Sequence, residues 1–240
     1  MTVSLAAESV KWELREPFRI ARSVITQVEG ILVTLTDEEG HKGRGEAYGI
    51  DYEGETVASM LDQVARARAG LYADPTRERL LEMLPHGGAR CAIDCALWDL
   101  EAKRSGVPAW RRAGVPRWQP IVSAFTIGIR EREDLIACAA SHTEFGLLKI
   151  KVNADKPLEA IETVHSVVPQ ARLIVDANQS WSFQALERYA PTCRDLGAVL
   201  LEQPIAAELD APLLDYECPV PICADEAVRV SADLPRVAGK

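Results

Sequence analysis

The N-terminal part of the chain changes from an alternating to a helical pattern of apolar positions. Over residues 3–48 apolar and polar residues alternate, and this alternation predicts an antiparallel meander of strands. Over residues 54–84 the apolar spacing is helical, and it is strongest over 89–104, where a helix stop signal follows at 105–108. Strands followed by helices predict an α+β domain, which we place at residues 1–115.

Beyond residue 120, short apolar runs alternate with segments long enough to form helices. The runs cover residues 121–129, 147–152, 172–179, 198–203 and 221–227. Strands that alternate with helices at short connections pair in parallel through right-handed crossovers. Residues 120–240 are therefore expected to form an α/β domain, separated from the first domain by a connector rich in Pro and Gly.

One polar residue that an apolar strand does not require stands near the end of each run. These residues are Thr126, Lys151, Asp176, Glu202 and Asp225, spaced about 25 residues apart. A (β/α) barrel places its active-site residues in this way, whereas a doubly wound sheet gathers them at one switch point, and the chain has no glycine-rich phosphate loop. The expected fold is a modified TIM (β/α) barrel, of which this chain holds about the first five strands.

Two lysines stand two residues apart inside the apolar run 147–152. On a strand, Lys149 and Lys151 point to the same face, while their apolar neighbours point to the other. A lysine directed into a protein interior loses hydration, and its pKa falls unless an opposite charge is nearby. These six residues alone are equally compatible with an edge strand that exposes a solvated lysine face.

The acidic residues Asp176, Glu202 and Asp225 would project from consecutive strands into one barrel mouth. Three converging carboxylates repel one another in a site of low dielectric constant, so they need a cation. Ligation by oxygen alone selects a hard divalent ion, with Mg²⁺ first and Mn²⁺ next. Beside such an ion, Lys151 as a neutral amine can remove a proton alpha to a carboxylate, and the ion stabilises the enediolate that results. Lys149 would tune Lys151 electrostatically.

Six short stretches in this order resemble one protein family. They are residues 18–22, 92–100, 148–151, 174–178, 201–204 and 223–226. The chain resembles the enolase superfamily, in its muconate-lactonizing-enzyme-like subgroup, and within it most resembles the dipeptide epimerases. The resemblance implies that Asp176, Glu202 and Asp225 bind the metal ion and that Lys151 transfers the proton. It also implies that the first domain caps the barrel and that an early loop closes over the ligand.

Four further residues are candidates for supporting roles. Arg22, in an expected loop at 17–23, would pair with a substrate carboxylate, although a solvated loop arginine is equally compatible. Thr126 would hydrogen-bond the substrate, or else serve only in ordinary packing. Asn178 and Glu226 would support the site from behind, since Glu226 is out of phase with Asp225 along the strand.

The implied activity is a 1,1-proton transfer that epimerises a dipeptide, such as L-Ala-D/L-Glu in murein peptide metabolism. A lyase or cycloisomerase on the same scaffold, such as o-succinylbenzoate synthase or muconate cycloisomerase, is the alternative. An aldolase that uses Lys151 as a Schiff-base nucleophile is a third reading. In the family a second lysine occupies the next strand end. That position would here fall beyond Lys240, because the chain stops before the expected sixth strand. We therefore expect part of a longer protein, or a non-catalytic fragment if the chain truly ends there.

The composition of the chain limits the classes of binding partner to be expected. The 240 residues carry a net charge of −9 without a block of Lys or Arg, which argues against nucleic acid or an anionic membrane and favours a small-molecule substrate. No secretory signal or membrane-spanning run is visible. Six scattered cysteines without a CxxC pair indicate buried, reduced thiols, and the four histidines are not spaced as zinc ligands. A cytoplasmic enzyme is expected, and assembly into a homo-oligomer is compatible with the sequence.

Overall fold

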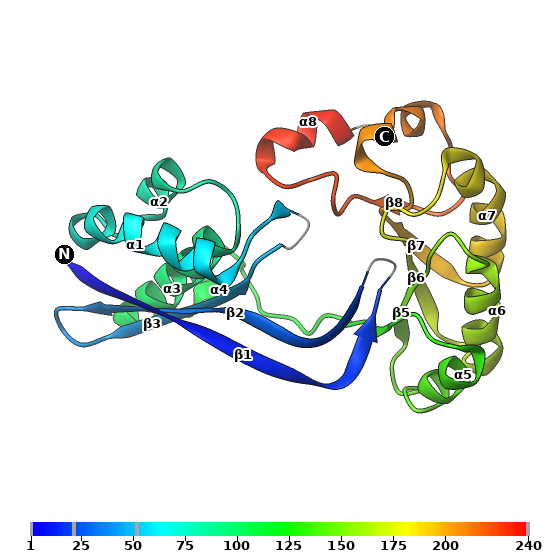
Figure 1. Ribbon diagram of the computed structural model, residues 1–240, viewed down its shortest axis with the longest axis horizontal. Helices are drawn as coiled ribbons and strands as arrows, with labels where there is room; N and C mark the ends of the chain where they lie inside the picture. Colours follow the sequence, from blue (N-terminus) through cyan, green and yellow to red (C-terminus); the bar gives the residue numbers. More distant parts are fainter. Residues whose placement is uncertain (1, 21–22, 51–52, 239–240) are drawn as a thin grey trace. The chain divides into compact units, whose positions relative to one another are not determined.

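The chain forms two compact units in the computed structural model, which describes residues 2–20, 23–50 and 53–238 (Figure 1). The first unit comprises Met1–Arg15 and Thr26–Pro120, and the second comprises Glu16–Ile25 and Ile121–Lys240. The segment Glu16–Ile25 thus belongs to the second unit, although its neighbours in sequence belong to the first. The sequence predicted a single division between residues 115 and 120. It did not indicate that Glu16–Ile25 belongs to the second unit.

A three-stranded sheet in the order β1-β2-β3 underlies the first unit. β1 spans Val3–Arg19, β2 spans Val24–Asp37 and β3 spans Lys42–Tyr48. β2 and β3 pair in antiparallel fashion, which confirms the predicted meander. β1 continues to Arg19, where a loop was expected from Pro17. β1 lies at the edge of the sheet, which is where strands tolerate proline.

The last long helix of the first unit ends at the stop signal seen in the sequence. The helices of this unit are α1 (Val57–Ala73), α2 (Arg77–Met83), α3 (Gly88–Ser105) and the short α4 (Ala109–Arg112). Thr56 caps α1 by accepting a hydrogen bond from the Ser59 N–H, and α3 ends at Gly106, whose φ of 65° suits glycine. The break between α1 and α2 divides the segment that the sequence predicted to be helical throughout.

Four cysteines differ from the expected buried environment, and two of these, Cys218 and Cys223, are half-buried. All six cysteines are free thiols, but Cys91 and Cys95 are exposed on α3 rather than buried. They lie outside the apolar stripe of this helix, where Ala92, Ala96 and Leu100 are buried. The pattern of α3 places the two thiols one helical turn apart on its polar flank.

A five-stranded parallel sheet in the order β4-β5-β6-β7-β8 forms the second unit. The strands are β4 (Phe125–Ile127), β5 (Leu147–Lys151), β6 (Arg172–Asp176), β7 (Ala198–Glu202) and β8 (Ile222–Cys223). Strand order equal to chain order is that of an α/β barrel, so the predicted fold class is confirmed as a partial barrel. The apolar run at 221–227 yields only a two-residue strand because the chain turns after Cys223.

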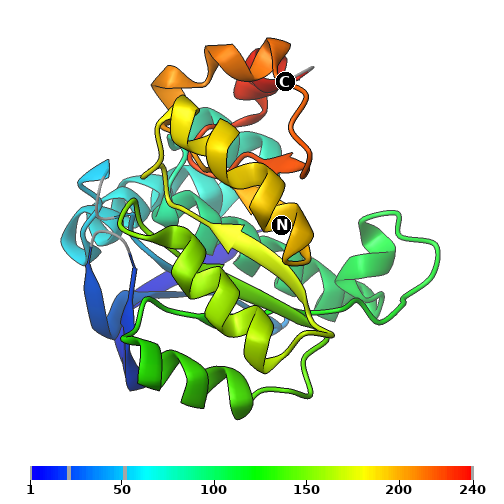
Figure 2. The ribbon, with the colours of Figure 1, turned by 90° about the vertical axis from the view of Figure 1, so that its right-hand side faces the viewer.

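Helices α5 (Arg132–Ala140), α6 (Pro157–Val167) and α7 (Phe183–Asp195) cover one face of this sheet (Figure 2). Leu148 and Ile150 of β5 are buried with apolar residues of these helices in one hydrophobic cluster. Lys149 and Lys151 alternate with them and therefore lie on the opposite face. Three short 3-10 turns, at Ala207–Leu209, Ala211–Asp215 and Ser231–Asp233, and the short α8 (Leu234–Val237) complete the unit. None of the described helices is both long and apolar enough to cross a membrane.

Candidate active site

The carboxyl ends of three neighbouring strands bring charged residues together. Lys151, Asp176 and Glu202 are the last residues of β5, β6 and β7. The parallel register pairs Lys151 with Asp176 and Asp176 with Glu202, so the three side chains stand in a row along one edge of the sheet. Thr126 pairs with Lys149 on the neighbouring strand, one step back from this edge.

Both lysines share one buried carboxylate. Lys151 Nζ lies 2.5 Å from Asp176 Oδ2 and 3.1 Å from Asn178 Oδ1. Lys149 Nζ lies 2.9 Å from Asp176 Oδ2 and 2.6 Å from Glu202 Oε1. The Asp176 side chain is fully buried. The side chain of Lys149 is 20% exposed, and that of Lys151 is 12% exposed. A solvated lysine face on an edge strand is therefore wrong, since β5 lies between β4 and β6 and both ammonium groups have partners.

The charged groups of this cluster shift one another's pKa values in different directions. Burial acts to raise the pKa of Asp176, but hydrogen bonds from Lys151 and Lys149 outweigh it and hold this pKa below its usual value. Burial acts to lower the pKa of Lys149, but Glu202 and Asp176 raise it above its usual value. The pKa of Glu202 is nevertheless raised, first by burial and then by the Asp176 charge, although Lys149 opposes both. Lys149 contacts two acids at once, so its charge only partly offsets the effects that raise the pKa of Glu202.

Asp225 lies two residues beyond β8, and its side chain is exposed. Cys223 links it to the cluster, because burial and then the negative charges of Glu202 and Asp225 raise the pKa of the Cys223 thiol. Asp176 acts on the same thiol in the same direction. The carboxylates of Asp176, Glu202 and Asp225 therefore all act on the pKa of this thiol. Their carboxylate oxygens are the donors that a hard divalent ion prefers.

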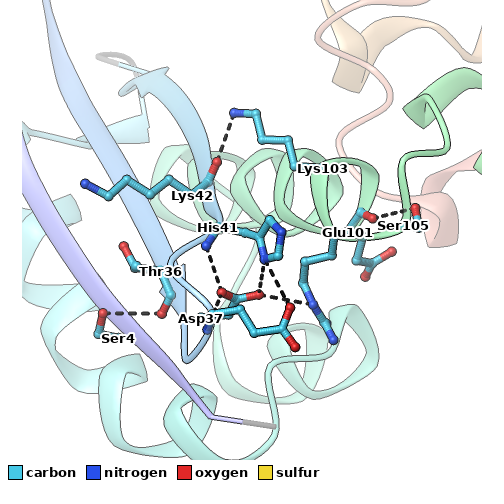
Figure 3. Close-up of polar contacts among 10 residues, drawn as sticks. Ser4, Thr36, Asp37, His41, Lys42, Glu101, Lys103 and Ser105 are labelled. Atoms are coloured by element: carbon cyan, nitrogen blue, oxygen red, sulfur yellow. Dashed lines mark hydrogen bonds and ion pairs between the residues drawn. The ribbon is translucent and has the colours of Figure 1, made fainter.

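A different group holds its ligand atoms closer together. Among the described residues, only Asp37, Glu39 and His41 bring three ligand atoms within 4.8 Å of one another. Asp37 Oδ1 accepts the N–H groups of Glu39 and His41, and Asp37 Oδ2 lies 3.1 Å from His41 Nδ1 and 3.2 Å from Arg104 Nε (Figure 3). These contacts occupy the Asp37 oxygens and neutralise the carboxylate. The contacts among these residues therefore stabilise the β2–β3 turn.

A buried glutamine joins the chain segments that follow the strands. Gln203 is 3% exposed and follows Glu202 directly. Its side-chain Oε1 accepts the N–H groups of Asp225 at 2.9 Å and Ala227 at 3.0 Å, and its Nε2 donates to Ile205 O at 3.0 Å. Sequence reasoning missed this residue, although it lies inside one of the conspicuous motifs, because its partners are backbone groups that no side-chain pattern reveals.

The remaining predicted residues have separate outcomes. Arg22 lies outside the described residues. Close to it in sequence, Arg19 O accepts the N–H of Ile129 at 2.9 Å, so this segment is attached just after β4. Asn178 contacts Lys151 as described above, and its backbone N–H donates to Asp176 Oδ1 at 3.0 Å. Glu226 is buried beside Asp225.

A partial parallel α/β barrel with lysines and carboxylates at its strand ends, preceded by an α+β unit, defines a class of barrel enzymes. Two family profiles match the chain: "Mandelate racemase / muconate lactonizing enzyme, N-terminal domain" over residues 2–114 and "Enolase C-terminal domain-like" over residues 133–239. L-Ala-D/L-Glu epimerase of Escherichia coli (strain K12) is 36% identical over 231 residues, which are 95% of this chain and 72% of that protein. The chain belongs to the enolase superfamily, among its dipeptide-epimerase-like isomerases.

Solved structures agree with this assignment. An enolase family member from Agrobacterium tumefaciens with homology to dipeptide epimerases, solved with sodium and L-Ala-L-Glu, is 33% identical with a TM-score of 0.93. Dipeptide epimerase from Methylococcus capsulatus, complexed with Mg and L-Arg-D-Lys, is 28% identical with a TM-score of 0.91. Each match covers 99% of this chain and 72% of the solved chain. An o-succinylbenzoate synthase from Geobacillus stearothermophilus is also related, at 28% identity over 92% of this chain and 62% of that protein.

Proposed function

We propose that the chain supplies the metal site and one proton-transfer lysine of a dipeptide epimerase that acts on L-Ala-D/L-Glu. The observation that carries this proposal is the row of Lys151, Asp176 and Glu202 at adjacent strand ends. The similarity to L-Ala-D/L-Glu epimerase of Escherichia coli (strain K12) and the L-Ala-L-Glu ligand of the Agrobacterium tumefaciens structure support the choice of substrate.

In this proposal, Lys151 moves the proton at the alpha carbon of the C-terminal residue. Its partner Asp176 holds the ammonium group at 2.5 Å and Asn178 accepts from it at 3.1 Å, so its Nζ is oriented at the strand end. Lys149 has a raised pKa, for the reasons given above, and remains a cation that steadies Asp176 and Glu202. Arg22 would pair with the side-chain carboxylate of a glutamyl substrate, and Thr126 would hydrogen-bond the substrate.

Asp176, Glu202 and Asp225 would hold Mg²⁺, or Mn²⁺ in its place. When bound, this ion withdraws charge from the substrate carboxylate and so makes the alpha proton more acidic. The Mg complex of the Methylococcus capsulatus enzyme supports the choice of ion. Asn178 and Glu226 would support this set from behind.

The test is proton exchange in D₂O. The full-length enzyme is incubated with Mg²⁺ and either L-Ala-D-Glu or L-Ala-L-Glu, and deuterium at the glutamyl alpha carbon is followed by NMR. We expect exchange that stops when EDTA removes the ion. Absence of deuterium from both epimers, in a protein that binds Mg²⁺, would contradict the proposal. Exchange that persists in EDTA, together with borohydride trapping of a carbonyl compound on Lys151, would favour Schiff-base chemistry instead.

A lyase activity is the second candidate because an o-succinylbenzoate synthase is among the relatives. The same metal and lysine can remove a proton alpha to a carboxylate and then expel a leaving group, which creates unsaturation. Ultraviolet absorbance with the synthase substrate separates the two functions. Turnover of that substrate without exchange into either dipeptide would favour the lyase.

A further inference from the structure

We propose that Gln203 is a positioning residue that holds the Asp225 carboxylate in register with Glu202 for binding of the divalent ion. This inference rests on the proposed function. Gln203 follows one proposed ligand directly, and its side-chain oxygen holds the backbone of the other at 2.9 Å. It touches neither substrate nor ion in this scheme.

The contacts of Gln203 fix the turn that carries Asp225. One oxygen, Oε1, accepts from both the Asp225 N–H and the Ala227 N–H, so both ends of the turn are held by a single atom. Val228 N–H closes the same turn by donating to Asp225 O at 3.0 Å. β8 is only two residues long and ends before Asp225, so sheet pairing alone does not place this ligand.

The backbone of Gln203 forms hydrogen bonds with the segments on both sides of it, one near the end of β8 and one after β6. Its N–H donates to Cys223 O at 2.9 Å, and its carbonyl accepts the Gln179 N–H at 2.8 Å. Gln203 has a φ of 34°, a left-handed conformation that is unfavourable for a residue with a side chain. The hydrogen bonds of the buried amide compensate for this conformation. Gln203 thus connects the segments after β6, β7 and β8, which carry or adjoin the three proposed ligands.

Substitutions of Gln203 can distinguish a role in positioning the metal ligand from a role in stability alone. Gln203→Met keeps the length and volume of the side chain but removes the acceptor, so the Asp225 turn loses its anchor. Groups that orient metal ligands from behind typically change metal affinity by about 10- to 100-fold. We expect Gln203→Met to weaken Mn²⁺ binding, measured by electron paramagnetic resonance on the folded protein, by about this factor. Gln203→Glu keeps an acceptor oxygen and should bind Mn²⁺ more tightly than Gln203→Met.

Thr163→Val is the matched control. Thr163 is 2% exposed, and its hydroxyl donates to Glu159 O and accepts from Arg132 Nη1, so the substitution also removes two hydrogen bonds from a buried side chain of the same unit. Thermal unfolding of the metal-free variants measures the loss of stability in each. We expect Thr163→Val to lose stability without any change in Mn²⁺ affinity.

A double-mutant cycle tests whether Gln203 acts through Asp225. If it does, Gln203→Met combined with Asp225→Asn should bind Mn²⁺ about as weakly as Asp225→Asn alone. Wild-type affinity in Gln203→Met, or additive losses in the double variant, would overturn the inference while leaving the proposed function in place. A wild-type protein that binds neither Mn²⁺ nor Mg²⁺ would overturn both.

Discussion

At the scale of single residues, the two lysines of β5 differ in their partners. Lys149 Nζ contacts two carboxylates, those of Glu202 and Asp176, whereas Lys151 Nζ contacts Asp176 and the neutral oxygen of Asn178. Burial acts to lower the pKa of Lys149, but its two carboxylate partners raise it above its usual value, so Lys149 stays protonated. This difference supports Lys151 as the group that exchanges a proton and Lys149 as the fixed cation.

Replacement of each lysine should therefore affect exchange unequally. We expect Lys151→Met to slow deuterium exchange into at least one epimer of L-Ala-Glu by a factor of about 10² to 10⁴, the usual contribution of a general base. Lys149→Met should slow exchange by a smaller factor, because it disturbs the charge balance without removing the base. NMR rates at saturating Mg²⁺ measure both effects. A larger loss for Lys149→Met would reverse the two roles.

A second prediction concerns stability against acid. Glu101 lies 2.7 Å from both Arg77 Nη1 and Arg112 Nη2. Burial acts to raise the pKa of Glu101, but hydrogen bonds from the two arginines outweigh it and hold this pKa below its usual value. A carboxyl whose pKa is lower in the folded state stabilises the protein above its unfolded pKa, near 4.3. That contribution is lost as the pH falls through the folded pKa.

We therefore expect Glu101→Gln to lower the free energy of unfolding at pH 7 by at most about 1 kcal/mol, since the pair is partly exposed. At pH 3 the variant and the wild type should differ less. Urea unfolding at the two pH values measures this, with Glu82→Gln as the control because Glu82 forms an exposed ion pair with Arg79. An equal difference at both pH values would contradict the assignment.

The sequence indicated those residues of the candidate site that follow a pattern along the chain. Lys151, Asp176 and Glu202 end strands at regular intervals, and the structure places all three at strand ends. Asp225 shows the limit of this reasoning, because its strand is too short to position it and a hydrogen bond from its N–H to Gln203 Oε1 fixes its backbone instead. Contacts between a side chain and distant backbone have no periodicity, so spacing did not single out Gln203.

At the scale of elements, close approach of α3 to β3 organises the first unit. A Cβ added at Gly45 would lie 2.0 Å from Ala92 O and 2.7 Å from Ala96 N, both backbone atoms of α3. Neither atom can move without shifting the helix, so only glycine allows this packing. The sequence predicted the strand and the helix by their periods. It did not reveal that they touch here, because a glycine in a strand pattern has several explanations.

We expect Gly45→Ala to lower the free energy of unfolding by about 1–3 kcal/mol, the usual range for overpacking a core. Gly146→Ala is the control, since a Cβ added there meets nothing within 4 Å. Chemical unfolding followed by circular dichroism measures both variants. A Gly45→Ala protein as stable as the Gly146→Ala protein would show that α3 and β3 separate easily.

At the scale of the whole molecule, the two units have separate interiors. One buried cluster contains Ile31, Met60 and Leu97, and the other contains Ile150, Leu173 and Leu201. Within the part of the chain that the structure describes, no buried residue belongs to both clusters. Hydrophobic periodicity distinguished these two parts, because alternation and helical spacing change near residue 120. It did not show that Glu16–Ile25 belongs with the second unit, since that depends on contacts distant in sequence such as Ile129 N–H to Arg19 O.

Separate interiors predict that the units lose stability independently. Overpacking at Gly45 should lower hydrogen-exchange protection in α1 and α3, while β5, β6 and β7 keep the protection of the wild type. Mass spectrometry of peptides from both units, at increasing urea concentration, measures this difference. A loss of protection that extends equally to β5, β6 and β7 would mean that the two interiors unfold as one cooperative unit.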